Sequence, residues 1–131
     1  MKIFVVEDSE FLLRYLVETL EESTTSKVVG SAPDEASAID WLKESSHVFD
    51  LIIIDIFLKS GTGLAVLNQI IQLSIQAKRV ILTNYATAEM RAYCAALGAH
   101  RVFDKSSEIA DLVEYCLQLQ LDEDLSAACI K

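Results

Sequence analysis

The stretch Asp50-Leu51-Ile52-Ile53-Ile54-Asp55 carries four apolar residues in succession and ends on an aspartate. A strand with one face in water alternates apolar with polar residues, whereas a strand buried on both faces is apolar throughout. Strands of the second kind occur in parallel sheets that helices cover on both sides. The stretch therefore predicts the central strand of an α/β fold, with Asp55 at its carboxyl end.

The rest of the chain repeats the alternation of a short apolar run and a longer segment of helical period. Strands are expected near residues 2–6, 27–32, 50–55, 78–83 and 100–104. Helices are expected to open at Ser9, near Pro33-Asp34, after Gly61-Thr62-Gly63, near residue 87 and at Ser107, and the fourth is expected to end at Gly98. Five strands that alternate with five helices predict a (βα)5 fold.

Length and composition limit the class of protein. A chain of 131 residues fits one domain. We expect that domain to cover residues 1–121, and residues 122–131 to be an extension that either continues the fifth helix or forms a tail. The three cysteines are widely spaced and lack a Cys-x-x-Cys pair, so they indicate neither a disulfide framework nor a zinc site.

The charge and hydropathy of the chain argue against two classes of partner, nucleic acids and membranes. The net charge of −9, without a cluster of lysine and arginine, argues against a nucleic-acid partner. No apolar stretch approaches the ~20 residues of a membrane span, and the sequence after Met1 lacks the pattern of a signal peptide. We therefore expect a cytoplasmic protein that binds neither membranes nor nucleic acids directly.

Polar residues follow four of the expected strands. Glu7 and Asp8 follow the first, Asp55 ends the third, Thr83 ends the fourth and Lys105 follows the fifth. Taken singly, Thr83 and Lys105 are better explained as solvated strand ends, Glu7-Asp8 as an acidic pair at a helix entry, and Asp55 is explained equally well as a loop cap. Because the carboxyl ends of parallel strands meet at one edge of the sheet, where open α/β folds bind their ligands, the whole set predicts a single site.

The residue types at this site favour phosphoryl chemistry. Carboxylates that lie close together repel one another unless a cation compensates, and Mg²⁺ prefers such oxygen ligands. Asp8 and Asp55 are expected to bind the ion directly, and Glu7 directly or through water. Lys105 and Thr83 offer an ammonium and a hydroxyl to phosphate oxygens, so Asp55 is the candidate nucleophile for an aspartyl phosphate.

Together these residues resemble the receiver domain of bacterial response regulators, the phosphoacceptor module of two-component signalling, over roughly residues 2–120. The matching pieces are Val5-Val6-Glu7-Asp8-Ser9, Asp50-Leu51-Ile52-Ile53-Ile54-Asp55, Gly63-Leu64, Thr83, and Gly98-Ala99 leading to Lys105. The resemblance implies a flavodoxin-like, doubly wound parallel sheet with strand order 2-1-3-4-5. It implies a signalling domain and not an enzyme.

By this resemblance, Asp55 would accept a phosphoryl group from a histidine kinase or a phosphotransfer protein. Mg²⁺ or Mn²⁺ would be held by Asp8, Asp55 and the backbone carbonyl of Phe57, with Glu7 beside them. Thr83 would then move toward the phosphate and reshape the face formed by the fourth helix, the fifth strand and the fifth helix. That face would contact a downstream protein target, and it is also a candidate homodimer surface.

Several positions depart from the family pattern. Ser106 follows Lys105 where proline is usual, so we expect a trans peptide there. Val102 occupies the position of an aromatic residue that often moves with the switch, and Phe103 is expected to point to the opposite side of the strand. Asn84 stands where a small residue usually follows the threonine, and it is expected to alter the phosphate pocket.

Phe57 and Tyr85 each lie two residues past a site residue, where water would approach an aspartyl phosphate. Their bulk predicts slow loss of the phosphoryl group.

We expect a stand-alone receiver and weigh three alternatives. A phosphatase of the haloacid-dehalogenase type also uses an aspartate at a strand end, but that family has a second aspartate where this chain has Phe57. A pseudo-receiver that only binds partners would not need the full set of site residues. A flavodoxin-like cofactor binder is a weaker alternative, because no phosphate-binding loop follows the first strand.

Overall fold

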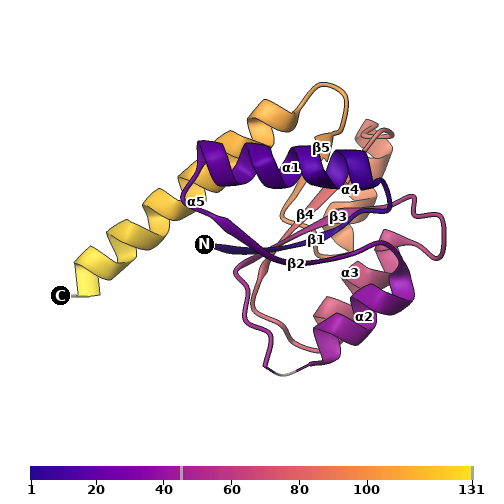
Figure 1. Ribbon diagram of the computed structural model, residues 1–131, viewed down its shortest axis with the longest axis horizontal. Helices are drawn as coiled ribbons and strands as arrows, with labels where there is room; N and C mark the ends of the chain where they lie inside the picture. The colour runs from indigo at the N-terminus through magenta and orange to yellow at the C-terminus, as the bar shows by residue number, and fades with distance from the viewer. Residues whose placement is uncertain (45, 131) are drawn as a thin grey trace.

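The computed structural model describes residues 1–44 and 46–130, with residues 124–130 described by their backbone only. Strands and helices alternate along the chain, which confirms the predicted (βα)5 order (Figure 1). The strands are β1 (Lys2–Val6), β2 (Lys27–Ala32), β3 (Leu51–Asp55), β4 (Lys78–Thr83) and β5 (Arg101–Asp104). The helices are α1 (Glu10–Ser23), α2 (Glu35–Lys43), α3 (Gly63–Gln72), α4 (Ala88–Ala96) and α5 (Ile109–Ile130).

The five strands form one parallel sheet in the order β2-β1-β3-β4-β5. This confirms the doubly wound, flavodoxin-like topology. β3 lies between β1 and β4, and every one of its residues is buried. The apolar run at residues 51–54 is therefore the central strand, as its lack of alternation predicts.

Helices cover both faces of the sheet and produce two apolar cores. On one face, Ile3 and Val5 of β1 pack with side chains of α1 and α5. On the other face, Phe4 and Val6 pack with side chains of α2, α3 and α4. Figure 1 shows α1 on the opposite side of the sheet from α2 and α3. Each large side chain buried in these cores stabilises the fold by about 1.5–3 kcal/mol.

Capping side chains open four of the helices. Ser9 Oγ accepts the Leu12 N–H, which confirms the predicted first cap. Asp34 caps α2, so Pro33 lies before the cap and not in the first turn as predicted. The reason is that Asp34 has extended backbone angles and its carboxylate accepts from Ser37. Thr62 and Thr87 cap α3 and α4 in the same way.

The fifth helix begins later than predicted. It starts at Ile109 and not at Ser107, and its first turn is closed by the Leu112 N–H on the Glu108 carbonyl. Ser106 is held in the preceding turn, where its N–H and hydroxyl both donate to Asp104 Oδ1. Residues 106 and 107 therefore belong to the turn after β5 and not to the helix.

The far end of α5 continues as helix to Ile130 and extends beyond the sheet (Figure 1). The sequence left open whether residues 122–131 continue the fifth helix or form a tail, and the backbone is helical as far as Ile130. Cys94 and Cys116 are buried thiols, and the side chain of Cys129 lies outside the described residues.

Three smaller predictions concern the backbone and the helices. The described part of the chain contains no cis peptide bond, so the trans peptide expected before Ser106 is confirmed. Gly98, with a φ of 108°, follows α4 as the predicted left-handed residue. Among the described helices, none has both the length and the apolar content that crossing a membrane requires.

Candidate functional site

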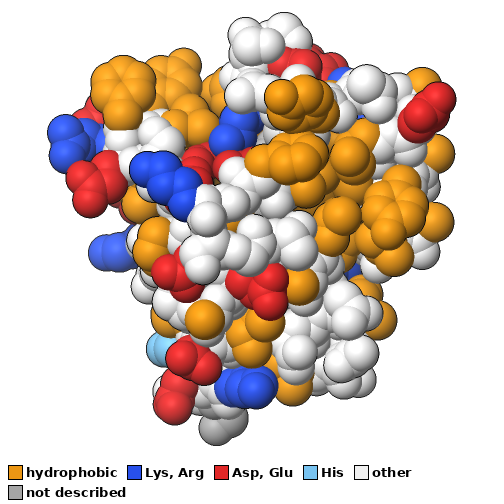
Figure 2. Space-filling view, turned by 90° about the vertical axis from the view of Figure 1, so that its right-hand side faces the viewer, with side chains coloured by type: hydrophobic (Ala, Val, Ile, Leu, Met, Phe, Trp, Pro, Cys, Tyr) orange, Lys and Arg blue, Asp and Glu red, His pale blue; other side chains and the backbone are white. Residues whose placement is uncertain are grey.

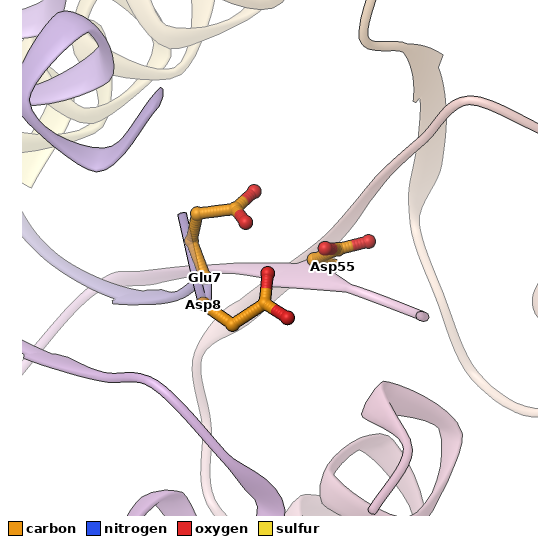
Figure 3. Close-up of side chains that lie close together, drawn as sticks. All are labelled: Glu7, Asp8 and Asp55. Carbon is orange, nitrogen blue, oxygen red and sulfur yellow. The ribbon is translucent and has the colours of Figure 1, made fainter. Parts of the chain in front are cut away.

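The predicted site residues meet at the carboxyl edge of the sheet. In the parallel register Val6 pairs with Ile54, and Ile54 with Ile81, so β1, β3 and β4 end side by side. Glu7 and Asp8 follow β1 directly, and Asp55 ends β3. Figure 3 shows the three carboxylates around a common space. One oxygen from each lies within 4.8 Å of the others.

Lys105 reaches this cluster from the loop after β5. Its ammonium donates to Asp55 Oδ2 at 2.8 Å and lies 2.8 Å from Glu7 Oε1. The Lys105 N–H also donates to the Thr83 carbonyl at 3.0 Å, which fixes the loop beside β4. The ammonium therefore pairs with two of the three carboxylates, and its single positive charge offsets one of their negative charges.

Burial makes the charges at this site interact strongly. Glu7 is 3% exposed and Asp55 is 4% exposed. Burial raises the pKa of Glu7, and the Asp55 charge adds to this, although the Lys105 ammonium and the Ser9 N–H act against it. Burial by itself would lower the pKa of Lys105, but its bonds to Asp55 and Glu7 outweigh burial and raise that pKa. The ammonium is therefore held in its charged form.

Backbone N–H groups orient each carboxylate. Ser9 donates to Glu7 Oε2 at 3.0 Å, Lys59 donates to Asp8 Oδ2 at 2.7 Å, and Phe57 donates to Asp55 Oδ1 at 3.2 Å. The contact from Lys59 could not be predicted from the sequence, because its donor is a backbone N–H, which nearly every residue type has.

The donor set fits a hard divalent cation. Three carboxylates face one another, and the Lys105 ammonium supplies one positive charge beside them, so three negative charges less one positive charge leave an excess of two when all three carboxylates are ionised. Glu7 Oε1 is buried, and its close partner among the described residues is the Lys105 ammonium at 2.8 Å, which it shares with Asp55. Oxygen ligands with excess negative charge are what Mg²⁺ binds in proteins.

Thr83 lies fully buried at the end of β4. Its Oγ1 accepts the Tyr85 N–H at 3.1 Å. The hydroxyl therefore keeps its own hydrogen available for a further acceptor. Asn84 and Tyr85 follow it on the surface.

The residues predicted to modulate the site fall in different places. Phe57 and Tyr85 are 53% and 61% exposed, and their rings meet edge to face at 4.9 Å between centroids. Val102 is buried in the core on the side of α2, α3 and α4, whereas Phe103 packs on the side of α1 and α5. The predicted opposite orientation of Val102 and Phe103 is confirmed, and Val102 itself is a core residue away from the acidic cluster.

Two residues that position the site were not predicted for that role. A Cβ atom on Gly63 would lie 2.0 Å from the Asp55 carbonyl oxygen, so α3 starts in direct contact with the end of β3. Glu35 of α2 accepts the Thr62 N–H at 2.9 Å and thereby holds the loop between β3 and α3. Gly61-Thr62-Gly63 suggested a break in the chain but not this contact.

Comparisons with known proteins agree with the geometry. The family model for the response regulator receiver domain matches residues 3–116. The nitrate/nitrite response regulator protein NarP of Escherichia coli is 33% identical over 82 residues, which is 63% of this chain and 37% of that protein. The transcriptional regulatory protein YvfU of Bacillus subtilis is 27% identical over 114 residues, 87% of this chain and 56% of that protein. The chain spans about half the length of the curated relatives that it matches first.

Solved structures show the same fold. The signal receiver domain of the response regulator NarL from Mycobacterium tuberculosis has a TM-score of 0.79 at 20% identity, covering 90% of this chain and 94% of that one. CheY in a complex with CheX, BeF₃ and magnesium from Borrelia burgdorferi has a TM-score of 0.81 at 18% identity, covering 91% and 88%. With a family model that matches most of its length, the chain belongs to the response regulator receiver domain family.

Proposed function

We propose that this receiver domain accepts a phosphoryl group on Asp55 and signals through a protein contact that depends on phosphorylation. The observation that carries the proposal is the position of Lys105, whose ammonium donates to Asp55 Oδ2 at 2.8 Å beside the carboxylates of Glu7 and Asp8. A carboxylate nucleophile next to a fixed cation and a metal site is the equipment that phosphoryl transfer requires.

The proposed metal is Mg²⁺, with Mn²⁺ as the substitute. Asp8, Asp55 and the backbone carbonyl of Phe57 would hold it, with Glu7 as a direct ligand or as an acceptor for a bound water. A divalent ion at this site neutralises the charge shared by the carboxylates and the incoming phosphoryl oxygens. The other roles in the reaction, attack on phosphorus and binding of the phosphoryl oxygens, are proposed for Asp55, Lys105 and Thr83.

In the proposed reaction an Asp55 carboxylate oxygen attacks phosphorus while the bond from phosphorus to the donor breaks. The donor is the phosphohistidine of a histidine kinase or of a phosphotransfer protein, and its imidazole leaves with the bonding electrons. Lys105 and the Thr83 hydroxyl would then bind oxygens of the phosphoryl group. Thr83 has a hydrogen to give, because its present bond uses the oxygen only as an acceptor.

The proposed output is a surface change near α4, β5 and α5. Thr83 ends β4, and the segment after it leads directly into α4. A contact between Thr83 and a phosphoryl group would favour one of two arrangements of this segment. We propose that a downstream protein or a second copy of the chain reads the difference, without direct contact to nucleic acid.

Incubation with acetyl phosphate and Mg²⁺, followed by intact mass measurement, tests this function. The expected result is the gain of one phosphoryl group per chain. Steady release of inorganic phosphate from many phosphate esters would instead favour the phosphatase alternative. A chain that gains no mass under these conditions would be a pseudo-receiver.

Mg²⁺ is expected to raise the stability of the wild-type protein and to do so less in an Asp8→Asn variant. At about 100 times its Kd the ion adds about 2.7 kcal/mol to the free energy of unfolding. Asp8 forms no ion pair with Lys105 among the described residues, so its charge adds repulsion that only the metal relieves. Without metal, Asp8→Asn should therefore unfold at a higher temperature than the wild type.

Thermal unfolding with Mg²⁺ and with a chelator measures both effects. Asp40→Asn is the matched control, because Asp40 is an exposed aspartate on α2. A wild-type melting temperature that does not respond to Mg²⁺ would contradict the metal site.

The phosphorylated protein is expected to lose its phosphoryl group slowly. Phe57 and Tyr85 pack against each other at this edge, and Figure 2 shows hydrophobic side chains around acidic and basic ones on this face of the molecule. Such packing limits the approach of water to an aspartyl phosphate. Phe57→Asn and Tyr85→Glu should each shorten the half-life by about tenfold or more, since they replace a ring with a group that binds water.

The decay of the phosphorylated species by intact mass measures this half-life. Tyr93→Glu is the control for Tyr85→Glu, because Tyr93 is an exposed tyrosine on α4. A half-life of seconds in the wild type, unchanged in both variants, would count against a role for the two rings.

A further inference from the structure

Arg91 of α4 joins three other segments of the chain through its guanidinium group. Its Nε donates to the Ala86 carbonyl at 3.0 Å, and its Nη1 donates to the Val102 carbonyl of β5 at 2.7 Å. Its Nη2 donates to Glu108 Oε1 at 2.5 Å. The same Glu108 oxygen accepts the Asp104 N–H at 2.8 Å. We call this set of four contacts the Arg91 clamp.

The clamp connects the two segments that carry the phosphate-binding groups. Ala86 lies three residues after Thr83, and Asp104 directly precedes Lys105. A guanidinium is planar and holds its donors in a fixed fork, so it cannot follow one partner without changing its geometry toward the others. Hydrogen bonds between charged groups are also the strong ones.

The charge state of Glu108 supports the clamp as a formed ion pair. The bond from Arg91 and the Asp104 N–H hold the pKa of the Glu108 carboxyl below its usual value. The carboxylate is therefore ionised at neutral pH, when the contacts to Arg91 and to Asp104 are both in place.

We infer that Arg91 is a positioning residue that couples the state of Thr83 to β5 and to the start of α5. The inference rests on the proposed function. In the present structure the Tyr85 N–H donates to Thr83 Oγ1, so any turn of the Thr83 side chain toward a phosphoryl group disturbs the segment that ends at Ala86. Arg91 holds the Ala86 carbonyl, and through the Arg91 clamp the disturbance reaches Val102 and Glu108.

Hydrogen exchange with and without beryllofluoride and Mg²⁺ tests the coupling, because beryllofluoride is a mimic of the phosphoryl group. In the wild type we expect exchange to change in residues 84–90 and in residues 109–116, the start of α5 beyond the segment of Lys105. In Arg91→Met we expect the change at 84–90 to remain and the change at 109–116 to fall by about tenfold, a typical size for an allosteric coupling. A residue with a merely structural role would not separate the two segments in this way.

Two further variants make the test specific. Glu108→Gln keeps an oxygen for the Asp104 N–H but removes the charge, so it should weaken the response at 109–116 with less risk to the fold. Arg101→Met is the matched control, because Arg101 lies on β5 next to Val102 and its guanidinium covers the rings of Phe103 and Tyr115 outside the clamp. It should respond like the wild type.

The outcomes separate this inference from the proposed function. A wild type that shows no response to beryllofluoride would overturn the phosphoacceptor function, and the coupling with it. A wild type that responds in both segments, with an equal response at 109–116 in Arg91→Met and Glu108→Gln, would overturn the coupling alone.

Discussion

Replacing Asp55 with asparagine is expected to abolish phosphoryl uptake from acetyl phosphate. The amide lacks the anionic oxygen that attacks phosphorus, so the rate should fall by at least about a thousandfold, as it does when enzymes lose their nucleophile. The fold should survive the change, because asparagine has the same size and its oxygen can still accept the Phe57 N–H.

Asp50→Asn provides the matched control for this variant. Asp50 lies at the other end of the same strand segment, where its Oδ2 accepts the Lys2 N–H, far from the three clustered carboxylates. Asp50→Asn should gain one phosphoryl group like the wild type, as measured by intact mass. Uptake by Asp55→Asn at the wild-type rate would place the phosphoacceptor on another residue.

The fold could be predicted because its strongest signals are local. The apolar run at residues 51–54 has no polar face to turn toward water, so it fits a central strand that is covered by helices on both faces. The two errors concern helix starts, where the deciding contacts are made by single side chains. The bonds from Ser106 to Asp104 keep the turn after β5 out of α5, and apolar periodicity cannot reveal them.

The candidate site was predictable to the extent that topology alone positions it. Once strands are parallel, residues at their carboxyl ends must converge, and this brings together Glu7, Asp8, Asp55 and Lys105. The Arg91 clamp was not predictable, because two of its acceptors are backbone carbonyls and its carboxylate partner lies 17 residues away. Contacts of this kind depend on the finished packing.

Gly63→Ala is expected to destabilise the protein strongly and to slow phosphorylation. Gly63 is the first residue of α3, and a Cβ there would lie 2.0 Å from the Asp55 carbonyl oxygen and 2.7 Å from Ile54 Cγ2. The backbone cannot easily move aside, because the Gly63 N–H donates to the Ile56 carbonyl at 2.9 Å. The methyl group must therefore displace either the start of α3 or the end of β3.

Helix propensity and steric contact predict opposite signs for this substitution. Alanine is better than glycine in a helix by about 1 kcal/mol, so propensity alone would make Gly63→Ala more stable. Overpacking in a closed site costs about 3 kcal/mol, which exceeds that gain. The steric term should decide the sign, and the variant should unfold at a lower temperature.

Ala88→Gly is the control, because Ala88 is the exposed first residue of α4 after its Thr87 cap. Ala88→Gly exchanges alanine and glycine in the reverse direction at the first position of a helix. It should lower the free energy of unfolding by less than about 1 kcal/mol. Thermal unfolding compares the two variants, and phosphoryl uptake then reports whether Asp55 has moved. If Gly63→Ala were as stable and as readily phosphorylated as the wild type, the contact between α3 and the end of β3 would not be what positions Asp55.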